Sequence, residues 1–151
     1  MASNATQIEI DGPRNVVTKT TGDDTAPTPA LPAFTIIQDP TNGSLSDMNP
    51  GMSGLHPATR LRIDCIQYSI SDGIAIQLYW NATTPILITE LSGRGKIEAK
   101  WFGGLQNNAG VGVTGAISFS VIVIDALAAG TVTWTLMLQT VKYRPISVGG
   151  A

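Results

Sequence analysis

The sequence predicts an all-β protein, an antiparallel β-sandwich or jelly roll with an extended N-terminal arm. The 151-residue chain contains 16 glycines and 9 prolines, which disfavours long helices. Apolar and polar residues alternate in several segments after residue 33, as expected of half-buried strands. Turn-forming residues separate these segments at intervals of about ten residues, which is typical of sandwiches rather than of βαβ folds.

The chain divides by composition into an arm, residues 1–33, and a β-sandwich domain, residues 34–151. Residues 7–10 and 16–20 have short strand-like patterns, but the arm has too few large apolar residues to build a core. The alternating prolines of residues 27–32 fix their own φ and bias their predecessors toward extended conformations, which predicts a stiff, polyproline-like segment. We therefore expect either a disordered tail or an arm that lies along a neighbouring subunit.

The clearest local pattern begins at residue 60. Apolar residues occupy every second position of residues 61–65, and the pattern then slips by one position at Ile66, which indicates a β-bulge. Asp72 and Gly73 follow, a pair that favours the type I′ turn of a hairpin. Residues 74–80 alternate again, so these segments predict a β-hairpin.

Further strands are predicted at residues 34–39, 85–91, 96–101, 116–125 and 131–143. The last two are long, and we expect them to pair with each other in antiparallel orientation. Trp80 and Trp134 fall on inward-facing sets and are predicted to pack in the core. Ile122, Ile124 and Met137 fall on the opposite face. Burying such a side chain is worth about 1.5–3 kcal/mol, so this face should be covered by the arm or by another subunit.

The composition excludes several classes of partner. Charged residues make up 13% of the chain, against about 25% in a typical domain, so the surface is largely neutral and costs little to desolvate. The net charge of −2 argues against a phosphate-binding face and hence against nucleic acid. The sequence predicts no signal peptide and no membrane helix, and the single cysteine cannot form an internal disulfide, so we expect a cytosolic origin.

A glycine-rich segment, residues 103–115, contains a formal match to the dinucleotide-binding pattern at Gly110, Gly112 and Gly115. That pattern binds a pyrophosphate only where the glycines open a helix, and here a predicted strand follows. The segment is therefore predicted to be an exposed loop. Because glycine and asparagine permit close backbone approach, the loop is suited to contacting a neighbouring subunit.

No catalytic, cofactor-binding or metal site is predicted. His56 is the only histidine and has no cysteine or carboxylate at metal-ligand spacing. A triad could assemble from distant residues, but no nucleophile has a suitable context. Nothing brings Glu90 and Glu98 together, and Cys65 lies on an apolar face as a small core residue. We therefore expect a protein that is not an enzyme and uses no cofactor.

The predicted function of the surface is subunit contact. Trp101 and Phe102 adjoin the glycine-rich loop and are the best candidates for exposed aromatic side chains. Together with the proline segment and the second apolar face they define a candidate interface. This interface comprises Pro27, Pro29, Leu31, Trp101, Phe102, Gly104, Leu105, Asn107, Ile122, Ile124 and Met137.

Three stretches, W-N-A-T-T-P-I at 80–86, L-S-G-R-G-K at 91–96 and F-G-G-L-Q-N-N-A at 102–109, carry a resemblance to a known group of proteins. They resemble small proteins of tailed bacteriophages, in particular the virion accessory proteins with β-sandwich or jelly-roll folds that decorate or cement capsids. The resemblance implies a homo-oligomer, such as a trimer, on the major capsid protein or other virion proteins. It also implies location in the virion, assembly in the host cytoplasm and terminal arms that clasp neighbours. It supplies no functional residues.

Three other functions remain open at this point. A neck, adaptor or tail component of a virion would share every feature described above. A carbohydrate- or receptor-binding β-sandwich would need exposed aromatic residues flanked by Asn, Gln or Asp in a groove. An enzyme would need a polar cleft that contains His56 or two close carboxylates.

Overall fold

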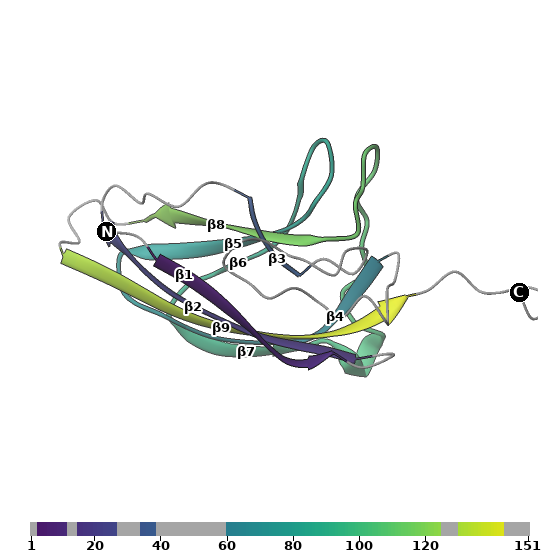
Figure 1. Ribbon diagram of the computed structural model, residues 1–151, viewed down its shortest axis with the longest axis horizontal. Helices are drawn as coiled ribbons and strands as arrows, with labels where there is room; N and C mark the ends of the chain where they lie inside the picture. Colours follow the sequence, from purple (N-terminus) through teal and green to yellow (C-terminus); the bar gives the residue numbers. More distant parts are fainter. Residues whose placement is uncertain (1–2, 12–14, 27–33, 39–59, 125–129, 144–151) are drawn as a thin grey trace, which may run out of the picture.

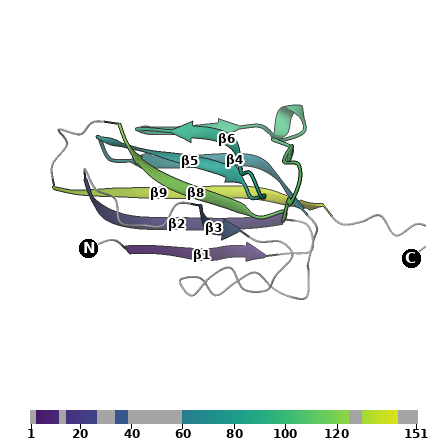
Figure 2. The same ribbon diagram turned by 90° about the horizontal axis from the view of Figure 1, so that it is seen from above.

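The computed structural model describes residues 3–11, 15–26, 34–38, 60–124 and 130–143. These residues form two antiparallel sheets that pack face to face, as Figures 1 and 2 show. The prediction of an all-β sandwich is confirmed.

The five-stranded sheet has the spatial order β1 (Ser3–Asp11), β2 (Asn15–Ala26), β9 (Gly130–Tyr143), β4 (Arg60–Ile70), β7 (Arg94–Glu98). The four-stranded sheet has the order β3 (Thr35–Gln38), β8 (Ile117–Val123), β5 (Ile74–Trp80), β6 (Ile86–Leu91). One turn of 3₁₀-helix, η1 (Lys100–Phe102), follows β7.

The strand order is that of a jelly roll. From β2 to β9 every consecutive pair of strands lies in opposite sheets, except for β5 and β6, which form a hairpin within the four-stranded sheet. This alternation places β2-β9-β4-β7 opposite β3-β8-β5-β6, the arrangement of an eight-stranded double-sheet jelly roll. Strand β1 is an addition at the edge, beside β2 (Figure 2).

The predicted hairpin across Asp72 and Gly73 is wrong. The chain does turn there, with a φ of 92° at Gly73, but β4 pairs with β9 and β7 while β5 pairs with β8 and β6. The turn is a crossover between sheets: the Ser71 amide donates to Thr133 of one sheet, and the Gly73 carbonyl accepts from Ile124 beside the other. Alternation reports only which side chains are buried, and it is the same for strands paired side by side and for strands facing each other.

The predicted pairing of the last two strands is wrong for the same reason. β8 pairs with β3 and β5, and β9 pairs with β2 and β4. Ile122 therefore lies on the outer face of the four-stranded sheet, with Ile124 just beyond the end of β8, whereas Met137 lies on the outer face of the five-stranded sheet. These three residues do not form one apolar cluster.

The bulge in β4 is confirmed, and its pairing with β9 locates it at Asp64. Ile63 pairs with Thr140 but Cys65 pairs with Gln139, so one residue of β4 is extra. The bulge shifts the inward set to Ile66. Cys65 is buried, with 4% of its surface exposed, but it lies on the outer side of the sheet beside Gln139.

Residues on the N-terminal side of the predicted boundary at residue 33 belong to the sandwich. β2 pairs with β9 along its whole length, from Asn15 opposite Val141 to Ala26 opposite Gly130. The boundary therefore does not coincide with an edge of the fold. Pro27, Pro29 and Leu31 lie outside the described residues, as does His56.

The inner side of β2 explains why its place in the sandwich is hard to predict. Thr18, Thr20 and Asp24 are buried there, where a pattern-based prediction looks for apolar residues. Gln38 of β3 bridges the two sheets: its amide nitrogen donates to Thr18 Oγ1 at 2.7 Å, and its amide oxygen accepts from Thr140 Oγ1 at 2.7 Å.

The rest of the interior is apolar. Trp80 and Trp134 are both buried, as predicted, and the Trp134 ring lies 6.3 Å from that of Phe119 on the opposite sheet. Isoleucines and leucines of β4, β5, β8 and β9 complete the main hydrophobic core.

Candidate assembly surface

Exposed large apolar side chains are concentrated in two parts of the described structure. Four of the seven are in the β7–β8 connection, and three are on or beside the four-stranded sheet; none is on the outer face of the five-stranded sheet. They are Trp101, Phe102, Val111 and Val113 in the connection, and Phe34, Leu87 and Ile124 at the four-stranded sheet.

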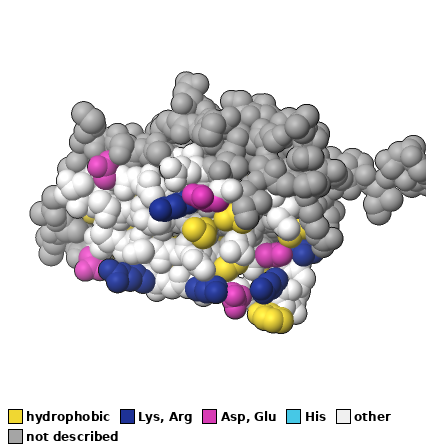
Figure 3. Space-filling view, turned by 60° about the horizontal axis from the view of Figure 1, so that its bottom comes forward, with side chains coloured by type: hydrophobic (Ala, Val, Ile, Leu, Met, Phe, Trp, Pro, Cys, Tyr) yellow, Lys and Arg dark blue, Asp and Glu magenta, His cyan; other side chains and the backbone are white. Residues whose placement is uncertain are grey.

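The outer face of the five-stranded sheet is polar. Figure 3 shows it as mostly uncharged surface, with positive and negative side chains interspersed and few apolar ones. Lys96 and Glu98 form an exposed ion pair there at 3.0 Å. Their hydrogen bond and charges raise the pKa of Lys96 and lower that of Glu98. Such a surface is well solvated and gains little from being covered.

The most prominent apolar feature is the aromatic pair on η1. Trp101 is 78% exposed and Phe102 69%, which agrees with their predicted surface position. The ammonium group of Lys100 lies 5.3 Å from the centroid of the Trp101 ring, within the range of a cation–π contact. Trp101 also makes a side-chain hydrogen bond to Glu98. Gly103, at a φ of 90°, ends the turn.

Gly104, Leu105 and Asn107 anchor the glycine-rich loop instead of presenting a surface. Gly104 is buried at a φ of 81°, and a Cβ there would lie 2.7 Å from Asp64 Oδ1, so only glycine fits. Leu105 exchanges two backbone hydrogen bonds with Ile63, at 3.0 and 2.8 Å. Asn107 is half-buried, and its side-chain oxygen accepts the Ala109 amide at 2.9 Å. These contacts fix the start of the loop on β4.

The tip of the loop is fastened to the β5–β6 turn. The Thr83 amide donates to Val111 at 3.3 Å, and the Thr114 amide donates to Asn81 at 3.1 Å. The Asn81 side chain donates to Thr114 Oγ1 at 2.9 Å. Gly112, with a φ of 76°, passes so close to Thr83 that any side chain would collide with it. Figure 1 shows the two loops projecting together beyond the four-stranded sheet.

The four-stranded sheet carries a short apolar strip on its outer face. The Phe34 ring packs edge-on against the Tyr79 ring, with the two ring centroids 4.8 Å apart. Leu87 is the cross-strand neighbour of Tyr79. Phe34 adopts a φ of 58°, a strained conformation for a bulky residue, and its amide donates to Ser120 Oγ at 3.0 Å. Glu90 of the edge strand accepts a hydrogen bond from Gln77 at 3.0 Å.

The interface predicted from sequence is thus only partly presented to solvent. Trp101, Phe102 and Ile124 are exposed and Gly104 is buried. The others that the structure describes are half-buried: Leu105, Asn107, Ile122 and Met137. Four further apolar residues are exposed that were not predicted to be so: Phe34, Leu87, Val111 and Val113. The absence of charge from residues 101–124 could have indicated the two valines, because an uncharged loop loses little when it is covered.

The described residues contain no group of three or more His, Cys, Asp or Glu side chains that could hold a metal ion. Glu90 and Glu98 lie on strands of opposite sheets. A hollow near the bulge contains Asp64 and Lys100 together with Gln139 and Asn15, but no second carboxylate. Within the described part of the chain, no helix has the length and apolar character needed to cross a membrane.

These features define a jelly-roll protein whose exposed apolar groups lie in uncharged loops and on one sheet. No family model matches this chain, and neither a curated protein nor a solved structure matches it.

Proposed function

We propose that this chain is a structural subunit of a virion, most simply a capsid decoration (cement) protein of a tailed bacteriophage that stabilises the shell through subunit contacts. The observation that carries the proposal is the concentration of exposed apolar side chains in the β7–β8 connection and on the four-stranded sheet. Groups of exposed apolar side chains, unlike single ones, mark interaction sites in soluble proteins. Jelly rolls are a recurrent architecture of capsid proteins, although the fold alone does not select a function.

The projecting loops are suited to docking on protein. Residues 101–124 contain no charged side chain, so covering them leaves no buried ion to compensate. Each valine or aromatic side chain that becomes buried contributes about 1.5–3 kcal/mol. The hydrogen bonds from Thr83 to Val111 and between Thr114 and Asn81 hold the tip in one conformation, which lowers the entropy cost of binding.

The partner proposed for this tip is the major capsid protein or another virion protein with an apolar, uncharged patch. A neck, adaptor or tail position would use the same chemistry. The described tip has no lysine or arginine to neutralise phosphate, which is why nucleic acid is not proposed.

The proposal is tested by cryo-electron microscopy and protein analysis of purified phage particles from a lysate in which this chain is produced. Val111→Asp places a charge at the most exposed apolar position, 88% exposed, and should reduce the particle-bound protein at least tenfold. Thr131→Asp, at an exposed position of the polar sheet face, is the matched control and should bind as the wild type does. Particles that lack the wild-type chain, or that bind Val111→Asp equally well, would overturn the proposal.

A second candidate is a carbohydrate-binding module, which the exposed Trp101 ring favours. The exposed amide side chains of Gln106 and Asn108 lie close by in sequence, and sugars stack on aromatic rings while they hydrogen-bond to amides. A glycan array separates this candidate from the first. Retention of the wild type and its loss in Trp101→Ala would favour sugar binding, and no retention would exclude it.

A further inference from the structure

A hollow of about 320 Å³ lies where β2 and β9 pass the bulge of β4 and the η1 turn. Its volume is at the low end of the range of about 300–1,000 Å³ for ligand pockets, so it suits one small cyclic group rather than a dinucleotide. Six of the side chains that line it carry the argument: Asn15, Val17, Asp64, Lys100, Gln139 and Val141.

The floor of the hollow is a checkerboard of amide and apolar side chains on two paired strands. Asn15 of β2 lies opposite Val141 of β9, and Val17 lies opposite Gln139. The residues between them on each strand are buried on the inner side of the sheet, so these four side chains point to the outer face. The two valines therefore lie on one diagonal and the two exposed amides on the other.

The wall of the hollow comes from the bulge. The extra residue, Asp64, accepts the Ala99 amide on its backbone carbonyl at 2.8 Å, which holds the start of η1 and the adjoining Lys100 beside the hollow. Arg62 Nε donates to Asp64 Oδ1 at 2.8 Å and fixes the carboxylate, whose side chain is 17% exposed. A carboxylate has about four acceptor positions, so Asp64 can also accept a hydroxyl group of a ligand.

The two charges that line the hollow have opposite signs. Asp64 would repel a phosphate and Lys100 would repel a metal ion, so neither kind of ion is favoured. A neutral group with hydroxyl and amide functions can bond to both charges. The side chains of Asn15 and Gln139 add donors and acceptors of their own.

The exposed Trp101 ring stands beside the hollow on the same face of the sheet. Lys100 lines the hollow, and its ammonium group lies 5.3 Å from the centroid of the Trp101 ring. Trp101 is also hydrogen-bonded to Glu98, which pairs with Cys65, and Cys65 pairs with Gln139. An aromatic ring, an apolar diagonal and a set of polar groups thus adjoin one another.

We propose that this hollow binds one N-acetylated hexose residue of a glycan, with the next sugar residue stacked on Trp101. The valines Val17 and Val141 fit the methyl of the acetamido group, and the amides Asn15 and Gln139 fit its polar atoms and the ring hydroxyls. An apolar surface with a few placed polar groups is typical of small-molecule sites. The inference rests on sugar binding, the second candidate function above, and gives that candidate a site and a ligand class.

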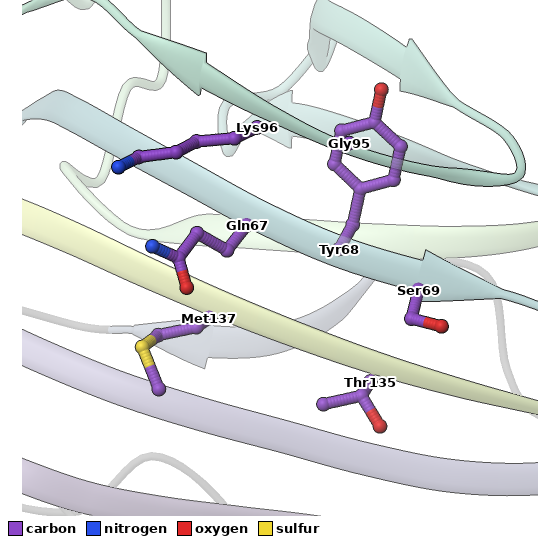
Figure 4. A pocket seen from close by; sticks show the side chains of 7 residues that line it. All are labelled: Gln67, Tyr68, Ser69, Gly95, Lys96, Thr135 and Met137. Carbon is purple, nitrogen blue, oxygen red and sulfur yellow. The ribbon is translucent and has the colours of Figure 1, made fainter.

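A second hollow on the same sheet face provides an internal control. It has a volume of about 330 Å³ and lies across β9, β4 and β7, and Figure 4 shows Gln67, Met137 and Lys96 side by side in it. Among the described residues that line it there is no carboxylate to offset Lys96. Gln67 is exposed like Gln139 but belongs to this other hollow, so it allows the same substitution to be made outside the proposed site.

The test is an NMR titration of the isotope-labelled protein with N-acetylglucosamine, N-acetylgalactosamine and N-acetylmannosamine. At least one of these sugars should bind with a millimolar dissociation constant and shift the amide signals of Val17, Asp64 and Gln139. The parent hexose should bind about tenfold more weakly, because it lacks both the methyl group and the acetamido hydrogen bonds.

Three variants locate the site. Gln139→Ala should weaken binding about tenfold through the loss of one amide, whereas Gln67→Ala, the matched control, should bind as the wild type does. Val17→Thr keeps the size of the side chain but adds a hydroxyl to the floor, so it should reduce the preference for the acetylated sugar over its parent hexose. Circular dichroism spectra that match the wild type would show that each variant folds.

Failure of all three sugars to bind, signal shifts confined to residues outside the hollow, or equal effects of Gln139→Ala and Gln67→Ala would overturn the inference. Glycan-array retention that depends on Trp101 but not on Gln139 would overturn this site and leave sugar binding standing. Val111→Asp should bind sugar as the wild type does, so its absence from phage particles would bear on the virion proposal alone.

Discussion

The interior of this sandwich has two parts that are stabilised in different ways. Between β4, β5, β8 and β9 it is filled by isoleucine, leucine and aromatic side chains around Trp134. Beneath β1 and β2 it contains buried hydroxyl and amide groups: Thr6 and Thr20 are hydrogen-bonded at 2.9 Å, and Gln38 links Thr18 to Thr140. Both parts are equally shielded from water, so burial by itself does not require apolar residues.

The difference shows what each part contributes to the fold. Apolar packing stabilises in proportion to area and without direction. A buried hydroxyl costs about 1–3 kcal/mol if its partner is missing and contributes little when the partner is present. The hydroxyl part therefore penalises wrong registers of β2 more than it stabilises the correct one. This is how a strand with few apolar residues occupies one position in the sheet.

The largest effect is expected in the apolar part. Trp134→Ala should lower the free energy of unfolding by about 3–5 kcal/mol, because it removes a buried indole packed against Phe119 and leaves a cavity. Urea denaturation measures the change. Trp101→Ala, at the exposed tryptophan, is the matched control and should change the unfolding free energy by less than about 0.5 kcal/mol. Equal effects at the two positions would contradict the assignment of core and surface.

Replacing the amide bridge tests the hydroxyl part. Gln38→Leu should cost about 2–3 kcal/mol in urea denaturation, because Thr18 and Thr140 lose their hydrogen-bond partner in a buried site. The triple variant Gln38→Leu/Thr18→Val/Thr140→Val removes all three polar groups and should recover most of this loss. If the triple variant is no more stable than Gln38→Leu, the bridge contributes more than the satisfaction of its own groups.

The threonine pair should show the same behaviour on a smaller scale. Thr20→Val leaves the Thr6 hydroxyl without its partner at 2.9 Å and should cost about 1 kcal/mol. Adding Thr6→Val should restore stability, giving a coupling energy of about 0.5–1.5 kcal/mol in a double-mutant cycle. Strictly additive effects would mean that the two hydroxyl groups do not depend on each other.

Cys65 lies in neither part of the interior, and the titration of its thiol is expected to have the smallest effect on stability. Burial, together with the charges of Glu98 and Asp64, raises the pKa of its thiol against the opposing effect of Lys96 and Lys100. The folded state therefore favours the protonated thiol; this contribution to stability is complete below the unfolded pKa of about 8.5 and is lost as the pH rises through the folded value.

We expect Cys65 to react with a disulfide reagent at pH 8 much more slowly in the folded protein than in urea. The difference should narrow at higher pH. A folded-state rate equal to that of the unfolded chain would show that the thiol is accessible.

Local patterns predicted the elements better than their arrangement. The alternation of residues 74–80 and 131–143 gave the strands β5 and β9 and the burial of Trp80 and Trp134. The bulge near Cys65 was visible because it shifts the apolar phase. The pairing of strands was not visible, because a turn at Gly73 is compatible with a hairpin and with a crossover. The role of β2 was missed because its inward residues are threonines and an aspartate.

The surface residues divide in the same way, into those that a local sequence pattern predicts and those that only the tertiary structure places. A lone aromatic pair beside a glycine-rich loop is recognisable in sequence, and Trp101 and Phe102 are indeed exposed. Gly104 and Leu105 share that composition but face β4. Only the distances to Asp64 and Ile63 distinguish an anchor from a contact surface.

The sequence by itself determined that this protein is built from strands, where most of them lie, and which large side chains are buried, because side-chain alternation is a local property of each strand. Only the tertiary structure decided which strands pair, that β1 and β2 complete the five-stranded sheet, and that Ile122 and Met137 lie on the outer faces of different sheets. These features depend on residues far apart in the chain. Their relative positions are set by the hydrogen bonds and packing of the whole sandwich and not by any local pattern.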